Sequence, residues 1–423
     1  MALLVMKFGG SSVADADAMR RVAQRVVSAH HAGDRVAVVV SAMGDTTDDL
    51  LDLAGQIASG TPPVREMDML LSAGERISMA LLAMAIEQLG VPARSYTGAQ
   101  AGMRTDTAHG QARLLDVQPG RVRGTLENGA VAIVAGFQGI STDDDITTLG
   151  RGGSDTTAVA LAAALDADVC EIYTDVDGLY TADPRIVPSA RRVTRLTIEE
   201  TLEMAAHGAK ILHLRAVEYA RRFQVPLHVR SSFSDKEGTW ILVGRPLTED
   251  TMEEPIISGI AHDKSLGKVT AVGIPDRPGA AAAVVGAVAR AGVAIDMIVQ
   301  NVSTSNAETS DISFTIPETD GRTAVAAVRE LQEQMGFTDV LYTSHVGKIS
   351  LVGAGMRSNP SVASKLFSAL ADAGVNIEMI STSEIRISVI CDQSNLEDAV
   401  RSVHTAFGLD TEDEAVVYGG TGR

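Results

Sequence analysis

The chain has 423 residues, of which 45% are apolar, so it is long enough for two or three globular domains with buried cores. Its formal net charge of −18 repels polyanions, which argues against nucleic acid or a membrane surface as a partner. The two cysteines, Cys170 and Cys391, are too few for a disulfide framework and fit the reducing cytoplasm. The first apolar run is too short for a signal peptide, and we expect no segment that spans a membrane.

The first predicted element is a short buried strand over Ala2 to Met6, followed by the motif Lys7-Phe8-Gly9-Gly10-Ser11-Ser12. Glycines after a strand let backbone N–H groups approach an anion, and Lys7 adds a positive charge at the same place. This pattern predicts a phosphate site. An ordinary glycine turn is the alternative, because such turns are common in α/β proteins.

Apolar runs then alternate with amphipathic stretches along the first 245 residues. The predicted strands cover residues 35–40, 131–137, 169–174 and 225–229, and the predicted helices cover 14–31, 68–88, 156–165 and 196–206. Such alternation predicts a mostly parallel sheet between two layers of helices, an αβα sandwich.

A second motif, Arg151-Gly152-Gly153-Ser154-Asp155, leads into the helix predicted from residue 156. Exposed N–H groups at the start of a helix attract anions, and the guanidinium of Arg151 suits a carboxylate or phosphate. The alternative is an ordinary capped helix, with Ser154 or Asp155 as the N-cap.

A third cluster, Tyr173 to Arg185, follows the predicted strand 169–174. Ligands of open α/β sheets bind beyond the carboxyl ends of the strands, so these acidic and aromatic residues are placed to meet a nucleotide. Turn formation explains part of the pattern equally well. Two further groups of polar residues are candidates for a binding site. Residues 41–48 follow a predicted strand and have an ordinary strand exit as the alternative. Glu75 lies in a predicted helix and has a structural ion pair as the alternative.

The chain changes character near residue 245. Residues 244–255 are acidic and contain two prolines, which indicates a linker. After it, Gly267-Lys268-Val269 recurs 80 residues later as Gly347-Lys348-Ile349, and a second segment recurs with nearly the same offset. Two α+β modules of the split βαβ type fit this repeat.

Together these motifs resemble the aspartate kinases, members of the amino-acid kinase family, over the whole chain. The resemblance implies a catalytic αβα domain at residues 1–246, a linker at 247–265, and two ferredoxin-like ACT domains at 266–345 and 346–423. It also implies ATP and Mg²⁺ as cofactors and the reaction of ATP with L-aspartate to give 4-phospho-L-aspartate and ADP. This is the first step toward lysine, threonine and methionine. An aspartate side chain is ionised at pH 7, so this nucleophile needs no general base.

The resemblance also assigns roles to residues. The catalytic residues would be Lys7 and Asp155. Those expected to bind ATP are Lys7, Phe8, Gly9, Gly10, Ser41, Thr174, Asp175, Tyr180, Asp183, Arg185 and Lys210. Those expected to bind aspartate are Ser41, Asp45, Thr47, Glu75, Arg151, Gly152, Gly153 and Ser154. No cluster of metal ligands is expected.

For regulation, the resemblance implies lysine and threonine as effectors, bound where the ACT modules of neighbouring chains meet. The expected effector residues are Asp276, Gly279, Ile295, Asp296, Gln300, Asn301, Val362, Ala363, Asn376, Ile377, Ser383 and Glu384. The sequence departs from the family's pattern at Ala280, Ala363, Ser310 and Ser313, which predicts weakened feedback inhibition.

For assembly, we expect a homo-oligomer, or a heterotetramer with a short subunit that starts at Met252; an ordinary linker methionine is the alternative. Two other functions remain open at this point. One is another amino-acid kinase with a glutamate-type substrate, and the other is a catalytically inactive amino-acid sensor.

Overall fold

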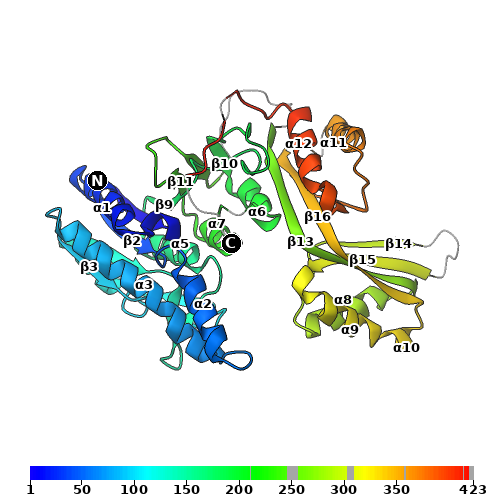
Figure 1. The fold of residues 1–423 in the computed structure, drawn as a ribbon, viewed down its shortest axis with the longest axis horizontal. Coiled ribbons are helices and arrows are strands. Elements are labelled where there is room, and N and C mark those ends of the chain that lie inside the picture. The colour runs from blue at the N-terminus through cyan, green and yellow to red at the C-terminus, as the bar shows by residue number, and fades with distance from the viewer. Residues whose placement is uncertain (210, 245–255, 303–308, 357–358, 413, 419–423) are drawn as a thin grey trace.

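The computed structural model describes residues 1–209, 211–244, 256–302, 309–356, 359–412 and 414–418. Figure 1 shows an N-terminal half with its own sheet and a C-terminal half built around the long strands β13 and β16. The predictions for Lys210 and Met252 lie outside the described residues.

The N-terminal half is built on an eight-stranded sheet in which every pair of neighbouring strands is parallel except β11 and β12. In spatial order its strands are β10 (Arg195–Thr197), β12 (Thr239–Leu242), β11 (Leu227–Ser231), β9 (Val169–Thr174), β1 (Leu3–Phe8), β2 (Arg35–Val40), β6 (Val131–Ala135) and β3 (Ala93–Tyr96). The expected mostly parallel sheet is confirmed.

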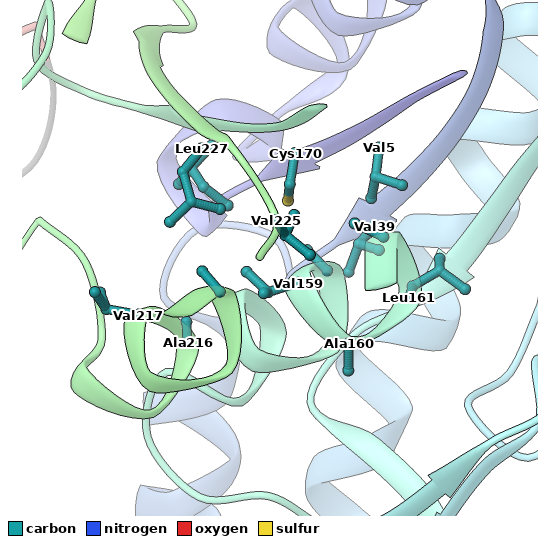
Figure 2. Close-up of a cluster of buried hydrophobic side chains, with 14 of the residues drawn as sticks. Val5, Val39, Val159, Ala160, Leu161, Cys170, Ala216, Val217, Val225 and Leu227 are labelled. Atoms are coloured by element: carbon teal, nitrogen blue, oxygen red, sulfur yellow. The ribbon is translucent and has the colours of Figure 1, made fainter. Parts of the chain in front are cut away.

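Helices cover both faces of this sheet because alternate side chains of the strands point to opposite sides. Val5 of β1 packs in one core, and Met6 in the other. The helices of this half are α1 (Ala16–His31), α2 (Thr46–Ile57), α3 (Val64–Glu87), α4 (Gly120–Glu127), α5 (Gly153–Leu165), α6 (Ile198–Ala206) and α7 (Leu214–Phe223). Figure 2 shows Val159 of α5 and Ala216 of α7 gathered with Val39 of the sheet. Helix α5 is apolar and buried almost all round, which fits its place between the sheet and α7.

In the described part of the chain, α3 is the one helix long and apolar enough to cross a membrane by length and composition. Its Leu82 and Ile86 are fully buried in the core beneath the sheet. A core position therefore accounts for much of its apolar character. A small second sheet lies near its other end, with the strands β5 (Leu114–Val117), β4 (Met103–Thr105), β7 (Gln138–Ser141) and β8 (Ile146–Thr148).

The C-terminal half is one six-stranded sheet shared by the two ACT modules. In spatial order its strands are β14 (Ile298–Val302), β15 (Thr309–Pro317), β13 (Ile256–Pro275), β16 (Asp339–Ala354), β18 (Arg386–Asp392) and β17 (Met379–Thr382). Its helices are α8 (Ala280–Arg290), α9 (Gly321–Arg329), α10 (Gln332–Met335), α11 (Pro360–Asp372) and α12 (Leu396–Ala406). Figure 1 shows α11 and α12 beside one end of the long strands and α8 to α10 beside the other.

The long strands β13 and β16 each serve both modules. The second half of β13 pairs with β15, and the second half of β16 pairs with β18. The first half of β13 pairs antiparallel with the second half of β16, with Ile260 opposite Leu351. The second ACT module therefore takes its last strand from the chain that precedes the first module.

The described part of the expected linker, residues 256–265, is strand in the structure. The acidic residues and prolines that indicated a linker end at Pro255, and Ile256-Ile257-Ser258-Gly259-Ile260 begins an apolar segment. Ile260 and Ala261 are buried. Ile260 pairs with Leu351, 91 residues later, so the local sequence carries no sign of the partner strand.

Candidate active site

A cavity of about 1320 Å³ lies at the carboxyl ends of β1 and β2, with α3, the small sheet and the start of α5 around it. Its lining includes most of the residues expected to bind aspartate and both expected catalytic residues: Lys7, Ser41, Thr47, Glu75, Arg151, Gly152, Gly153, Ser154 and Asp155. Residues from well-separated parts of the sequence thus share one space.

Lys7 and Asp155 form an ion pair in this cavity. Lys7 Nζ lies 2.6 Å from Asp155 Oδ1, and both side chains are about nine-tenths buried. Lys7 lies near the end of the central strand β1, and Asp155 lies in the first turn of α5. The sheet and the helix hold the two groups in place, so the ammonium is oriented before any ligand arrives.

The N-terminus of α5 faces the same cavity. Gly152, directly before the helix, has φ +68°, and a Cβ there would lie 2.0 Å from His213 Cγ. Only glycine fits this position, because of both its left-handed backbone and the imidazole against it. First-turn amides of a helix lack intrahelical acceptors and carry partial positive charge, so they can bind an anionic group.

Glu75 supplies a buried carboxylate from the middle of α3. Its Oε1 accepts a hydrogen bond of 3.3 Å from the Ala42 backbone N–H, and its buried Oε2 has no partner among the described residues. Burial raises the pKa of Glu75 to about 7. A carboxylate held in this way is ready to accept hydrogen bonds from a cationic ligand group.

Arg151 provides the opposite charge. It is exposed at the cavity and forms no ion pair with any other described residue. Ser41 and Thr47 add hydroxyl groups from the end of β2 and the start of α2. Asp45 is exposed and does not line the cavity. The cavity can therefore meet an ammonium with Glu75 and a carboxylate with Arg151.

A second, smaller cavity of about 160 Å³ lies where β9 ends. It is lined by five of the residues expected to bind ATP, Thr174, Asp175, Tyr180, Asp183 and Arg185. The Arg185 guanidinium lies 3.6 Å from the Asp175 carboxylate. Ile260, Ala261 and His262 of β13 and Val417 near the C-terminus also line it. Both halves of the chain therefore contribute to this cavity.

In the glycine turn after β1, some residues pack inside the protein and others face the cavity. Phe8 is fully buried and stacks on Tyr173 with ring centroids 4.6 Å apart, so only its backbone can face a ligand. A Cβ on Gly10 would lie 3.0 Å from the Gly44 carbonyl oxygen. The turn therefore packs closely on the loop after β2, while Lys7 points into the cavity.

Several polar residues of the cavity were not predicted from the sequence, and three of them contact the loops around it. Asp68 of α3 is buried and accepts hydrogen bonds from Thr148 Oγ1 (2.5 Å) and Gly110 N (3.0 Å). Arg215 of α7 donates to the Leu149 carbonyl at 2.7 Å. These residues hold the loops around the cavity, but each is a single charge in an ordinary helical pattern, which gives no sequence signal.

His213 is the third of these residues. It precedes α7 and lies against Gly152, and burial lowers its pKa. Its buried Nδ1 has no hydrogen-bond partner among the described residues. A neutral imidazole beside the Lys7–Asp155 pair adds no charge to the cavity.

Four of the expected effector residues lie at opposite edges of the C-terminal sheet. Gln300 and Asn301 lie on β14, whereas Ser383 and Glu384 directly follow β17, and these strands form opposite edges of the six-stranded sheet. Val362 is buried in the core of the second module. A site that used both edges would need a second chain.

Comparisons with known proteins agree with this geometry. The amino acid kinase family matches residues 2–231, and the ACT domain matches residues 269–332 and 349–407. The aspartokinases of Mycolicibacterium smegmatis and Corynebacterium glutamicum are 61% and 58% identical to this chain, over 100% of each chain.

Solved structures give the same result. The crystal structure of Escherichia coli aspartokinase III in complex with aspartate and ADP (R-state) is 27% identical, with a TM-score of 0.83 over 96% of this chain and 100% of that chain. The same enzyme in complex with lysine and aspartate (T-state) gives a TM-score of 0.69 over 95% and 99%. The fold described above is therefore nearer to that of the aspartate and ADP complex.

Proposed function

This chain belongs to the amino acid kinase family, and from its full-length similarity to aspartokinases we infer that it transfers the γ-phosphoryl group of ATP to L-aspartate. The products are 4-phospho-L-aspartate and ADP. The reaction opens the route to lysine, threonine and methionine. The observation that carries the substrate assignment is the placement of Glu75 and Arg151 on one cavity with the Lys7–Asp155 pair.

In this proposal, the large cavity binds aspartate by its charges. The unpartnered Oε2 of Glu75 accepts a hydrogen bond from the ammonium, and Arg151 binds a carboxylate. Ser41, Thr47 and the start of α5 complete the contacts. The substrate side chain is already an anion at pH 7, so no residue has to remove a proton from it.

Phosphoryl transfer then depends on alignment and on positive charge around the transferring group. Lys7 and the first-turn amides of α5 supply that charge, and Asp155 orients the Lys7 ammonium. Mg²⁺ would be carried by the ATP phosphates, and Asp155 is a carboxylate in the cavity that could hold it. Bound there, Mg²⁺ would neutralise charge on the phosphoryl oxygens.

The nucleotide itself is assigned to the smaller cavity after β9. Residues 175–190, which we call the nucleotide loop, place Asp175, Tyr180, Asp183 and Arg185 beyond the carboxyl end of a central strand. This is where open parallel sheets bind nucleotides. The phosphates would then extend toward Lys7, whose strand β1 is the neighbour of β9 in the sheet.

For regulation, we propose that lysine, and threonine with it, bind at the ACT modules. The solved complex of aspartokinase III with lysine supports the first effector for this family. Gln300 and Asn301 lie at the opposite edge of the sheet from Ser383 and Glu384, which supports a site between neighbouring chains.

We propose a cytoplasmic oligomer for this chain. Helix α3 exposes Ile77, Leu81 and Met84, one turn apart along the helix, at 52%, 40% and 60% of their surface. An apolar stripe of this kind suits a contact between copies. A short subunit that begins at Met252 would contain β13 from Ile256, and with it every described strand of both ACT modules.

The test is a coupled ADP-release assay with aspartate, glutamate and acetylglutamate as alternative acceptors. We expect turnover with aspartate alone, and Arg151→Ala should raise the KM for aspartate at least about tenfold. Turnover with a glutamate-type acceptor instead would show a different amino-acid kinase. If no acceptor supports turnover, the result would indicate a catalytically inactive amino-acid sensor.

A further inference from the structure

The nucleotide loop packs on the second ACT module. Its apolar side chains Val176, Tyr180 and Ile186 belong to the same buried cluster as Val403 of α12 and Leu409 after it. Leu179 of the loop belongs instead to a core of the kinase sheet, which is a separate cluster. The conformation of this loop therefore depends on residues that follow it by more than 200 positions.

Residues 409–412 and 414–418, which we call the C-terminal strap, run antiparallel to this loop. The backbone N–H of Thr411 donates to the Ser189 carbonyl at 2.9 Å, and that of Tyr418 donates to the Asp175 carbonyl at 2.8 Å. Two isolated β-bridges, Val417 with Val176 and Asp410 with Ala190, also join the strap to the loop. Figure 1 shows the strap in red, leaving α12 toward the kinase half. The strap thus holds the loop at both of its ends.

His404 ties the middle of the loop to the same strap. Its ring is fully buried, with Nδ1 3.0 Å from Asp410 Oδ1 and Nε2 2.8 Å from Thr181 Oγ1. Asp410 Oδ1 also accepts a hydrogen bond of 2.6 Å from Ser189 Oγ. With a carboxylate at Nδ1, that nitrogen carries the proton, so the Thr181 hydroxyl donates to Nε2. The imidazole stays neutral because burial lowers the pKa of His404.

The strap also reaches the cavity. Val417 lines it together with Asp175 and Arg185, and the Tyr418 ring stacks on Phe233 with centroids 5.8 Å apart. Val416, one position earlier, is 41% exposed and does not line the cavity. One residue of the strap therefore forms part of the wall, and its neighbour serves as a control.

We propose that His404 and the C-terminal strap hold the nucleotide loop in its ATP-binding conformation, with His404, Asp410 and Val417 as positioning residues for the nucleotide. This inference rests on the assignment of the nucleotide to the cavity after β9. The hydrogen-bonded chain from Thr181 to Ser189 fixes the loop, and Val417 completes the wall against which the nucleotide packs.

The experiment measures ADP affinity by calorimetry and both KM values by coupled assay on full-length variants. Thr181→Val and Val417→Ser should each weaken ADP binding and raise the KM for ATP about five- to tenfold, as expected for one lost buried contact. The KM for aspartate should stay within about twofold of the wild type, since its cavity is separate. His404→Phe should have a larger effect, and His404→Gln, whose amide reaches the Nε2 position, should recover part of the affinity.

Ser402→Ala and Val416→Ala are the matched controls and should bind ADP as the wild type does. Ser402, also on α12, donates to the Ala369 carbonyl within the ACT module at 2.9 Å, away from the loop. If Thr181→Val and Val417→Ser bind ADP normally while Arg185→Ala binds it more weakly, the proposed role of the strap is wrong and the proposed nucleotide site stands. If Arg185→Ala also binds ADP normally, the nucleotide site itself is misplaced, and both proposals fail.

Discussion

Lys348, a fully buried lysine of the second ACT repeat, lies 2.6 Å from the Asp296 carboxylate of the first repeat. The pair has a counterpart, because Lys268 of the first repeat binds Glu378 of the second. The four residues occupy matching positions of the internal repeat, Lys268 with Lys348 and Asp296 with Glu378. The two modules are therefore joined by reciprocal ion pairs across a pseudo-two-fold relationship.

The two ion pairs should differ in strength because their burial differs. The Lys348 side chain is 1% exposed, whereas that of Lys268 is 20% exposed. Lys348→Ala should lower the unfolding free energy by about 3 kcal/mol, and Lys268→Ala by about 1 kcal/mol. Thermal denaturation of the two variants checks this, and equal shifts in Tm would contradict it.

Lys7 is expected to act on the chemical step. Replacing it with alanine removes the ammonium beside Asp155 and should lower kcat about 100- to 1000-fold, the usual effect of losing one preorganised charge. Lys264→Ala, at an exposed surface ion pair, is the control. In Lys7→Ala, the ACT modules should stay folded and still bind lysine. Normal turnover in Lys7→Ala would show that this reading of the site is wrong.

The raised pKa of Glu75 should make aspartate binding sensitive to pH. The ordinary pKa of 4.5 is raised to about 7 by burial, so the carboxylate that would accept the substrate ammonium forms only as pH rises through 7. The KM for aspartate should therefore fall between pH 6 and pH 8. In Glu75→Gln this dependence should disappear and the KM at pH 8 should rise. Glu87→Gln, at the exposed end of the same helix, should behave as the wild type.

The same shift has a consequence for stability. Between pH 4.5 and about 7 the folded protein holds a proton on Glu75 that the unfolded chain has released, so stability falls as pH rises through this window. The loss amounts to about 3 kcal/mol. Glu75→Gln should avoid it and be more stable than the wild type at pH 8. Chemical denaturation at pH 5 and pH 8 measures this, and a parallel pH dependence in both proteins would contradict it.

Gly152 should tolerate no side chain. Gly152→Ala combines a left-handed backbone with a clash of its Cβ against the His213 ring, and should lower both activity and stability strongly. Gly33 provides the comparison, because it has φ +96° with open space around its Cβ position. Gly33→Ala should cost only about 1 to 2 kcal/mol of stability from the backbone alone. Similar losses in the two variants would show that the contact with His213 has no effect.

Feedback inhibition should be weak in this protein. Ser313 Oγ bonds Thr270 Oγ1 at 2.9 Å, and Ser310 Oγ accepts from Gln300 at 3.1 Å, so both hydroxyls are already engaged within the first ACT module. Ala280 and Ala363 carry no hydroxyl. Titration with lysine and threonine together should give incomplete inhibition, and Ala280→Ser with Ala363→Ser should restore sensitivity about tenfold. Complete inhibition at low concentrations of both would refute this.

Local signals in the sequence were sufficient for the sheet and the main cavity. The strand predicted over 169–174 coincides with β9, and the helix predicted over 156–165 begins three residues after α5 and ends with it, because each is an apolar run with clear ends. Most residues that line the main cavity at the ends of β1 and β2 and at the start of α5 were predictable because glycine turns and charges at strand ends are local patterns. Short strands such as β8 (Ile146–Thr148) have no such pattern.

Features that depend on distant partners were missed. The first half of β13 reads as the end of a linker until its pairing with β16 is known. Asp68 and His213 are ordinary residues in sequence and become part of the site only through the folding of the loops around them. The contact of the strap with the nucleotide loop could not be predicted for the same reason, since 223 residues separate Thr181 from His404.

That separation affects the protein while it is being made. At roughly 5 to 20 residues per second, a ribosome needs about ten to forty seconds to reach α12 after the nucleotide loop has emerged. During that time the apolar side chains that Val403 and Leu409 later cover have no partner, although the strands of the kinase sheet are complete once β12 has been made. A chain that ends before α12 would therefore have a folded kinase sheet with a nucleotide loop that lacks its packing partner. Incomplete copies would be poor consumers of ATP.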